Sequence, residues 1–287
     1  MLRIFPVLFL TFLISSCAFQ TLKRTKDINY ISANTLEDLP NKSLDVYAPK
    51  KAENLPVLVF FYGGSWKSGK KEMYHFLGNR LARRDVIVVI ADYPLSPDYE
   101  IPAMQASALA AVNWAKDNID NYGGDPDRIF VSGHSAGGHL ASLIAVKENG
   151  LKPSVNRKKL AGSILIDAAG LDMYGYLEET SEGEGKKYLN AFTDDPTVWK
   201  EYSSMYFLTD KLSPMLILEG ERTYPSIRAS RERFMMRIKE KGIEDVTVKI
   251  YPKKKHIPMI TQFLWTGSKV YKDVLGFIKD TNSDDFE

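Results

Sequence analysis

Short apolar segments of β type alternate with amphipathic segments of helical type along most of this chain. The β-type segments are residues 43–49, 56–62, 85–93, 128–133, 163–168, 214–220 and 246–252, and the helical ones are residues 72–83, 104–118, 137–147, 230–241 and 265–279. Buried strands that alternate with helices form mostly parallel sheets with helices on both faces. The pattern therefore predicts an α/β fold, whose chemistry gathers at the carboxyl ends of the strands.

The first 16 residues have the pattern of a secretory signal peptide. Arg3 precedes an apolar run at residues 4–14, which is shorter than the ~18 residues that a membrane-spanning helix needs and suits the apolar core of a signal. Cys17 follows and is the only cysteine of the chain. The stretch "ISSC" that ends at Cys17 resembles the lipobox of bacterial lipoproteins, in which the signal is cut before the cysteine and the cysteine is acylated.

The lipobox resemblance implies a lipid-anchored membrane protein of the bacterial cell envelope, facing the periplasm or the exterior. Residues 17–28 would then be a polar tether, and the lipid on Cys17 would hold the protein at the membrane, because each buried methylene of an acyl chain contributes ~0.8 kcal/mol. A plain signal peptide that is cleaved nearby is the alternative.

The rest of the chain is predicted to form one domain at residues 29–280, followed by an acidic, flexible tail at residues 281–287. Residues 171–212 interrupt the alternation and are rich in aromatic residues. They form either an excursion packed on the main domain or a cap that shapes a pocket.

The formal net charge of the chain is +2, from 38 basic and 36 acidic residues, whereas a nucleic-acid-binding protein shows a strong basic excess. We therefore expect no nucleic-acid partner.

Ser135 is the candidate nucleophile. It is the centre of the pentapeptide "GHSAG" at residues 133–137, between a β-type segment and a helical one. Gly-x-Ser-x-Gly in this context is a nucleophile elbow. Its glycines permit a sharp turn that a Cβ atom would obstruct, and the following helix directs its N–H groups and the positive end of its dipole at the serine.

An oxyanion site is predicted on the loop after the segment at residues 56–62. Gly63 and Gly64 can turn backbone N–H groups toward a bound carbonyl oxygen. In an elbow fold such a loop acts with the N–H of the residue after the nucleophile, which is Ala136 here. We therefore expect Gly63, Gly64 and Ala136 to stabilise an oxyanion.

The motifs from about residue 43 to residue 256 resemble those of α/β-hydrolase esterases of the hormone-sensitive-lipase-like and kynurenine-formamidase-like group. The matching stretches include "LDVYAP", "YGGSWKSGKK", "ADYPLSP", "GERTYPSIRASRERF" and the highly specific "DRIFVSGHSAGGHLA". The resemblance implies the α/β-hydrolase fold and hydrolysis of small esters or amides, without a metal or an organic cofactor.

The resemblance also assigns the base of a catalytic triad. His256 follows the last β-type segment, where the chain order Ser–acid–His puts the base. Of the other three histidines, His139 stands where the family usually has a structural histidine, His134 lies inside the elbow, and His75 lies on an early helix. The lysines at residues 253–255 beside His256 favour a solvated turn over a site that attracts anionic substrates.

The acid of the triad is the open position. The family usually has an aspartate three residues after the glycine that is Gly220 here, but this chain has Thr223, which cannot carry the charge that stabilises an imidazolium. Glu221 is the first alternative because it lies in the same loop. Asp167 or Asp172, after the neighbouring β-type segment, is the second, and the absence of any acid is the third. Two further departures are Tyr62, at the histidine position of His-Gly-Gly, and Ser107, where an aspartate is common.

Two functions are compatible with these observations. The first is a serine esterase that hydrolyses small carboxylic esters through an acyl-enzyme on Ser135. The second is a binding protein of the cell envelope with an eroded, catalytically weak hydrolase site. The intact elbow, the Gly63–Gly64 loop and His256 favour the enzyme. The three departures from the family pattern, at Thr223, Tyr62 and Ser107, favour the binding protein.

Overall fold

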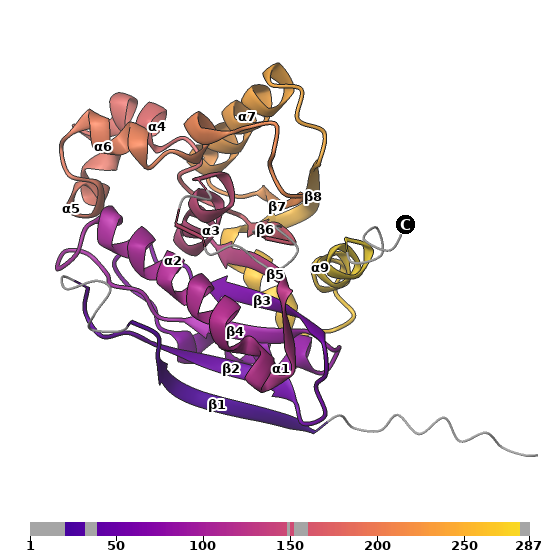
Figure 1. Ribbon diagram of the computed structural model, residues 1–287. Coiled ribbons are helices and arrows are strands. Elements are labelled where there is room, and N and C mark those ends of the chain that lie inside the picture. Colours follow the sequence, from indigo (N-terminus) through magenta and orange to yellow (C-terminus); the bar gives the residue numbers. More distant parts are fainter. Residues whose placement is uncertain (1–20, 32–38, 148–149, 152–159, 282–287) are drawn as a thin grey trace, which may run out of the picture.

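The computed structural model describes residues 21–31, 39–147, 150–151 and 160–281 (Figure 1). The expected signal peptide, Cys17 and nearly all of the acidic tail lie outside the described residues. Within these ranges, eight strands form a single sheet in the order β1-β2-β4-β3-β5-β6-β7-β8. The β1–β2 and β2–β4 pairs are antiparallel and the remaining five pairs are parallel. The predicted mostly parallel sheet is thus confirmed.

The strands are β1 (Leu22–Asn29), β2 (Ser43–Pro49), β3 (Leu55–Phe61), β4 (Ile87–Ala91), β5 (Gly124–His134), β6 (Gly162–Ile166), β7 (Met215–Arg222) and β8 (Val246–Lys255). The α-helices are α1 (His75–Ala82), α2 (Ile101–Asn118), α3 (Ala136–Lys147), α4 (Met173–Thr180), α5 (Leu189–Phe192), α6 (Pro196–Glu201), α7 (Pro225–Glu240), α8 (His256–Thr261) and α9 (Lys269–Asp280). Short 3₁₀ helices are η1 (Lys71–Tyr74), η2 (Ile119–Tyr122), η3 (Glu184–Tyr188), η4 (Ser204–Phe207) and η5 (Gln262–Leu264).

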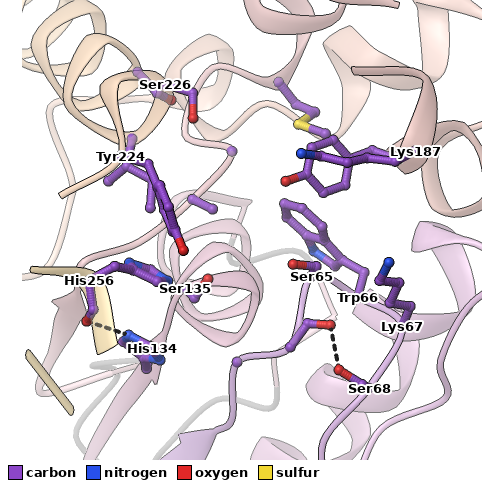
Figure 2. Close-up of a pocket in the computed structure, with 18 of the residues that line it drawn as sticks. Ser65, Trp66, Lys67, Ser68, His134, Ser135, Lys187, Tyr224, Ser226 and His256 are labelled. Atoms are coloured by element: carbon purple, nitrogen blue, oxygen red, sulfur yellow. Dashed lines mark hydrogen bonds between the residues drawn. The ribbon is translucent and has the colours of Figure 1, made fainter. Parts of the chain in front are cut away.

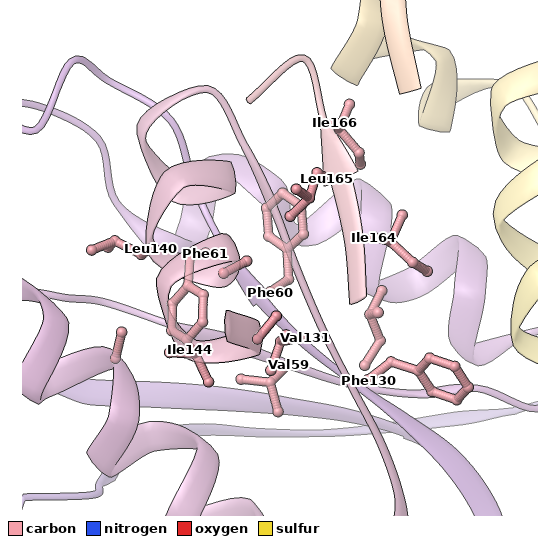
Figure 3. Packing of buried hydrophobic residues seen from close by; sticks show 14 of the residues in the cluster. Val59, Phe60, Phe61, Phe130, Val131, Leu140, Ile144, Ile164, Leu165 and Ile166 are labelled. Carbon is pink, nitrogen blue, oxygen red and sulfur yellow. The ribbon is translucent and has the colours of Figure 1, made fainter. Parts of the chain in front are cut away.

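The central strands are apolar in continuous runs because helices cover both faces of the sheet. Successive side chains of a strand point to opposite faces. Phe61 of β3 lies beside Ile144 of α3 (Figure 3), and the ring of Phe130 on β5 lies 6.1 Å from the ring of Phe277 on α9. Helices α2 and α3 therefore cover one face, and α1 and α9 cover the other (Figure 1). The predicted helices on both faces are confirmed.

Residues 22–29 correct one expectation. The sequence assigns residues 17–28 to a tether, but residues 22–28 belong to the edge strand β1, which pairs with β2. The strand is rich in polar residues, as edge strands commonly are, so its pattern resembles that of a tether. In the described residues, no helix has both the length and the apolar character to cross a membrane.

A buried lysine joins β1, β2 and β4. Nζ of Lys71 lies 2.6 Å from the carboxylate of Asp27 and 2.8 Å from that of Glu72, with Asp45 at 3.7 Å and Asp92 at 3.6 Å. Burial by itself would lower the pKa of Lys71, but the hydrogen bonds to Asp27 and Glu72 and the charges of the other two carboxylates raise it above the ordinary value. Lys71 is therefore charged, and it fixes the loop between β3 and α1.

The segment at residues 171–212 forms short helices α4–α6 with η3 and η4, in a group at one end of the molecule (Figure 1). The segment contains both buried aromatic residues and aromatic residues that line a cavity. Phe192 and Trp199 are buried in the core, as in a packed excursion. Tyr176 and Tyr188 instead line a cavity above the sheet, as in a cap.

Candidate active site

Ser135 lies at the sharp turn between β5 and α3. Its φ is 55°, a backbone conformation that is uncommon for a residue with a side chain. Three hydrogen bonds hold the turn: the N–H of Ser135 donates to the Ile166 carbonyl at 3.1 Å, and the Ser135 carbonyl accepts from the N–H groups of His139 at 3.0 Å and Ala169 at 3.1 Å. This geometry is that of a nucleophile elbow.

The glycines of the elbow are required by its close packing. A Cβ atom on Gly137 would lie 2.1 Å from the carbonyl oxygen of Phe61, and one on Gly133 would lie 2.2 Å from the backbone of Gly137. Neither position has room for a side chain. The sequence motif and the tight β5–α3 turn therefore have the same steric origin.

His256 and Asp167 form a buried pair. Nδ1 of His256 lies 2.6 Å from Oδ2 of Asp167. His256 is 7% exposed and Asp167 is 1% exposed. Because Nδ1 is directed at the carboxylate, the other ring nitrogen, Nε2, is the one available to a reacting group. His256 and Ser135 line the same cavity (Figure 2).

The Asp167 carboxylate accepts from two more donors. Its Oδ1 atom accepts from the N–H of Gly220 at 2.8 Å, and its Oδ2 atom accepts from the Thr223 hydroxyl at 2.5 Å. The residue directly follows β6, with a φ of 48°, and its own N–H donates to Leu218 of β7 at 2.7 Å. The β6–β7 pairing therefore brings the carboxylate to the turn that contains Thr223.

The other candidate acids are engaged elsewhere. Glu221, the first choice from the sequence, is exposed, and its carboxylate accepts from the N–H of Lys253 at 2.6 Å. Asp172 caps α4 through the N–H of Gly175 and forms an ion pair with Arg233. The structure thus favours Asp167 over Glu221, because Glu221 lies in strand β7 and its carboxylate contacts Lys253 of the adjacent strand β8.

The expected oxyanion loop packs directly against Ser135. A Cβ atom on Gly63 would lie 3.0 Å from the Cβ of Ser135. The N–H of Gly63 already donates to the hydroxyl of Tyr74 at 3.3 Å, a contact that the sequence does not predict. Gly64 has a φ of 146°, which favours glycine. Ala136 begins α3, where helical N–H groups lack intrahelical acceptors.

Two of the remaining histidines, His134 and His139, are buried. His139 is buried, contacts the Tyr202 carbonyl through Nε2 at 2.7 Å, and accepts from Trp66 at 3.2 Å. Burial lowers its pKa to about 4. His134 contacts the His256 carbonyl through Nε2 at 3.2 Å (Figure 2), and burial, with the nearby His256, lowers its pKa to about 3. His75 is exposed on α1.

The two other departures from the family pattern have clear packing roles. Tyr62 is buried and stacks on Tyr93, with ring centroids 4.6 Å apart. Ser107 is buried and lies 2.6 Å from the hydroxyl of Tyr30. Neither residue lines the cavity at Ser135.

The cavity has a volume of about 750 Å³. One wall contains Ser135, His256 and Tyr224, and the opposite wall contains Trp66, Lys67 and Lys187 (Figure 2). The ring of Tyr224 lies 5.0 Å from that of His256. In the described part of the chain, no group of three or more His, Cys, Asp or Glu residues is arranged to hold a metal ion.

Comparison with known proteins identifies the family. The BD-FAE family model matches residues 44–229. The chain belongs to the BD-FAE family. The matched region of this BD-FAE protein includes Ser135, Asp167 and Thr223, whereas His256 lies C-terminal to it.

Curated relatives of this BD-FAE protein are named as esterases. It is 27% identical over 257 residues to the probable isoprenylcysteine alpha-carbonyl methylesterase ICMEL1 of Arabidopsis thaliana, with 83% of this chain and 53% of the relative covered. It is 28% identical over 213 residues to the esterase LipQ of Mycobacterium tuberculosis, with 70% and 50% covered. The chain therefore spans about half the length of these relatives.

Solved structures confirm the predicted α/β-hydrolase fold. An inhibited esterase B from Lactobacillus rhamnosis superposes with a TM-score of 0.74 at 18% identity, covering 92% of this chain and 88% of that chain. A truncated carbohydrate esterase from gut microbiota gives a TM-score of 0.75 at 18% identity, covering 93% and 98%.

Proposed function

We propose that this protein is a serine hydrolase of small carboxylic esters that acts through an acyl-enzyme on Ser135. The observation that carries the proposal is the buried 2.6 Å contact between His256 and Asp167 beside the elbow serine. The relatives named as esterases support the same reaction class. In this proposal Asp167 is the acid of the triad, which replaces the aspartate expected at the position of Thr223.

The first half of the reaction forms the acyl-enzyme. Nε2 of His256 accepts the proton of the Ser135 hydroxyl while Oγ attacks the ester carbonyl carbon. Asp167 holds the imidazole with Nδ1 protonated and stabilises the imidazolium that forms. The imidazolium then donates its proton to the leaving alcohol, and the carbonyl re-forms as an acyl ester of Ser135.

Backbone N–H groups stabilise the negative charge that develops on the carbonyl oxygen. Gly64 and Ala136 are the preferred donors, because the N–H of Gly63 already has the Tyr74 hydroxyl as acceptor. In the second half, water attacks the acyl group, with His256 as base and then as acid. The carboxylic acid product is released and the hydroxyl of Ser135 is regenerated.

Hydrolysis of p-nitrophenyl acetate and butyrate tests the proposal. We expect the wild type to hydrolyse both esters and to be labelled by a fluorophosphonate probe. Ser135→Ala should lose both properties, with a fall in kcat of several orders of magnitude. Equal hydrolysis by the two proteins, or neither hydrolysis nor labelling by folded wild type, would contradict the proposal.

The alternative function is a cell-envelope binding protein with an eroded site. Thr223, Tyr62 and Ser107 favoured it in the sequence. However, Thr223 contacts the Asp167 carboxylate at 2.5 Å, so an acid is still present beside His256, and neither Tyr62 nor Ser107 lines the cavity. The esterase therefore has the stronger support. A folded wild type that neither hydrolyses esters nor labels at Ser135 would favour the binding function.

For localisation, we propose that Cys17 is the lipid-modified first residue of the mature protein in the bacterial cell envelope. The motif ending at Cys17 and the lack of another cysteine support this. Cell fractionation tests it, since Cys17→Ser should leave the membrane fraction and change the processing of the precursor. Unchanged fractionation and processing would contradict the anchor.

A further inference from the structure

Thr223 is one of the donors that surround the Asp167 carboxylate. An ionised carboxylate accepts hydrogen bonds and cannot donate them. Burial disfavours its negative charge unless hydrogen-bond donors compensate for the lost water. Here the carboxylate is 1% exposed and its donors are the N–H of Gly220, the hydroxyl of Thr223 and Nδ1 of His256. Only one of these donors, Thr223, is a hydroxyl that a single conservative substitution can remove.

The turn between β7 and α7 determines where the Thr223 hydroxyl lies. The N–H of Thr223 donates to the Gly220 carbonyl at 2.9 Å, and Thr223 is 7% exposed. The next residue, Tyr224, lies with its ring 5.0 Å from that of His256. The same short turn therefore places the Thr223 hydroxyl at Asp167 and the ring of Tyr224 near His256.

The hydroxyl and the imidazole contact the same carboxylate oxygen. Oδ2 of Asp167 lies 2.5 Å from Oγ1 of Thr223 and 2.6 Å from Nδ1 of His256, while Oδ1 is held by Gly220. With both oxygens restrained, rotation of the carboxylate is opposed, and Oδ2 stays directed at Nδ1. A side chain of the same shape without a hydroxyl would fill the space but would leave Oδ2 held by the imidazole alone.

We propose that Thr223 is a positioning residue that orients Asp167 toward His256 and shares the charge of its Oδ2 atom. This inference rests on the proposed function, in which Asp167 is the acid of the triad. Thr223 stands where the family usually has the catalytic aspartate. In this chain it donates a hydrogen bond to Asp167, the proposed acid, which follows the neighbouring strand β6.

Two variants separate the hydrogen bond from the packing. Thr223→Val keeps the shape of the side chain and removes the donor, whereas Thr223→Ser keeps the donor and removes a methyl group. We expect Thr223→Val to lower kcat roughly tenfold with little change in KM, because a hydrogen bond to a charged group is lost. Thr223→Ser should retain most of the activity, because the hydroxyl donor is still present.

The pH dependence of kcat/KM is a readout that packing alone would not change. Without the Thr223 donor, Oδ2 keeps more negative charge and holds the imidazolium more strongly. The acid limb of the profile should therefore move to higher pH in Thr223→Val and not in Thr223→Ser. The other groups that face the ring are His134, which burial keeps neutral, and Tyr224, and both are unchanged in the variants.

A proton NMR measurement gives a result that does not depend on activity. The hydrogen between Nδ1 of His256 and Oδ2 of Asp167 should give a low-field signal, which Asp167→Asn removes as the assignment control. We expect Thr223→Val to shift this signal and Thr223→Ser to restore it. Melting temperatures of all variants show whether they are folded.

The outcomes distinguish the inference from the proposed function. If the wild type hydrolyses esters and Thr223→Val matches it in kcat, pH profile and NMR signal, the positioning role is wrong while the esterase proposal stands. Equal losses in Thr223→Val and Thr223→Ser would also overturn the role, since packing would then explain them. If folded wild type has no esterase activity, the proposed function fails, and the NMR comparison alone decides whether Thr223 orients Asp167.

Discussion

Oδ2 of Asp167 lies 2.6 Å from Nδ1 of His256, although the two residues are 89 positions apart in the chain. Parallel pairing of β6 with β7 and of β7 with β8 brings them to the same edge of the sheet. In α/β sheets this edge, at the carboxyl ends of the strands, is where catalytic groups gather. The contact decides which of the candidate carboxylates acts as the acid in our mechanism.

Replacement of Asp167 should nearly abolish turnover. Asp167→Asn keeps the size of the side chain but removes the charge that stabilises the imidazolium, so we expect kcat to fall by roughly 10⁴-fold, as in other serine hydrolases. Glu221→Gln is the matched control and should stay within about threefold of wild type, because the carboxylate of Glu221 is exposed and contacts Lys253. If Glu221→Gln lowered kcat more than Asp167→Asn did, Glu221 and not Asp167 would be the acid of the triad.

A carboxylate at position 223 should lower the proposed esterase activity. In Thr223→Asp the new group would lie against Oδ2 of Asp167, and two carboxylates in contact disfavour each other's ionisation. We expect kcat/KM to fall at least about tenfold. Thr223→Asn, which has the same shape without the charge, should lose less. A gain in activity for Thr223→Asp would show that Asp167 is not the acid.

Removal of the buried cation should destabilise the N-terminal part of the sheet. Lys71→Met leaves the buried Asp45 and the partly buried Asp92 without this positive charge, and breaking a buried ion pair costs about 3 kcal/mol. Lys70→Met, at the exposed neighbouring position, is the control and should change the free energy of unfolding by less than about 0.5 kcal/mol. Urea denaturation measures the free energy of unfolding of both variants. Equal losses in Lys71→Met and Lys70→Met would contradict the stabilising role of the buried Lys71.

The buried histidines should make the fold sensitive to acid. Burial lowers the pKa of His139 from 6.5 to about 4, so the unfolded chain binds a proton at this residue before the native state does. The contribution of neutral His139 to the free energy of unfolding is complete above about pH 6.5 and is lost as the pH falls toward 4. Between pH 7 and pH 5 the free energy of unfolding should fall by about 2 kcal/mol. His139→Gln should show a smaller fall over this range in denaturant titrations. An identical pH dependence in both proteins would contradict this account.

Several features of the protein follow from local sequence. The apolar runs predict the central strands β3 and β4 because residues buried on both faces must be apolar throughout. Gly133 and Gly137 predict the elbow because they flank Ser135 in the motif Gly-x-Ser-x-Gly, between a β-type segment and a helical one. These features are readable from short stretches of sequence, although at Gly137 it is Phe61 of β3 that leaves no room for a side chain.

Other features depend on contacts between distant segments. The polar residues 22–29 become strand β1 only because the edge of β2 is available to pair with them. The hydroxyl of Tyr74 meets the N–H of Gly63 because the loop after β3 folds back over the sheet. The choice of Asp167 over Glu221 depends on the pairing of β6 with β7 and of β7 with β8, which brings Asp167 to His256 and places Glu221 against Lys253. Strand pairing is a tertiary property that no short stretch of sequence contains.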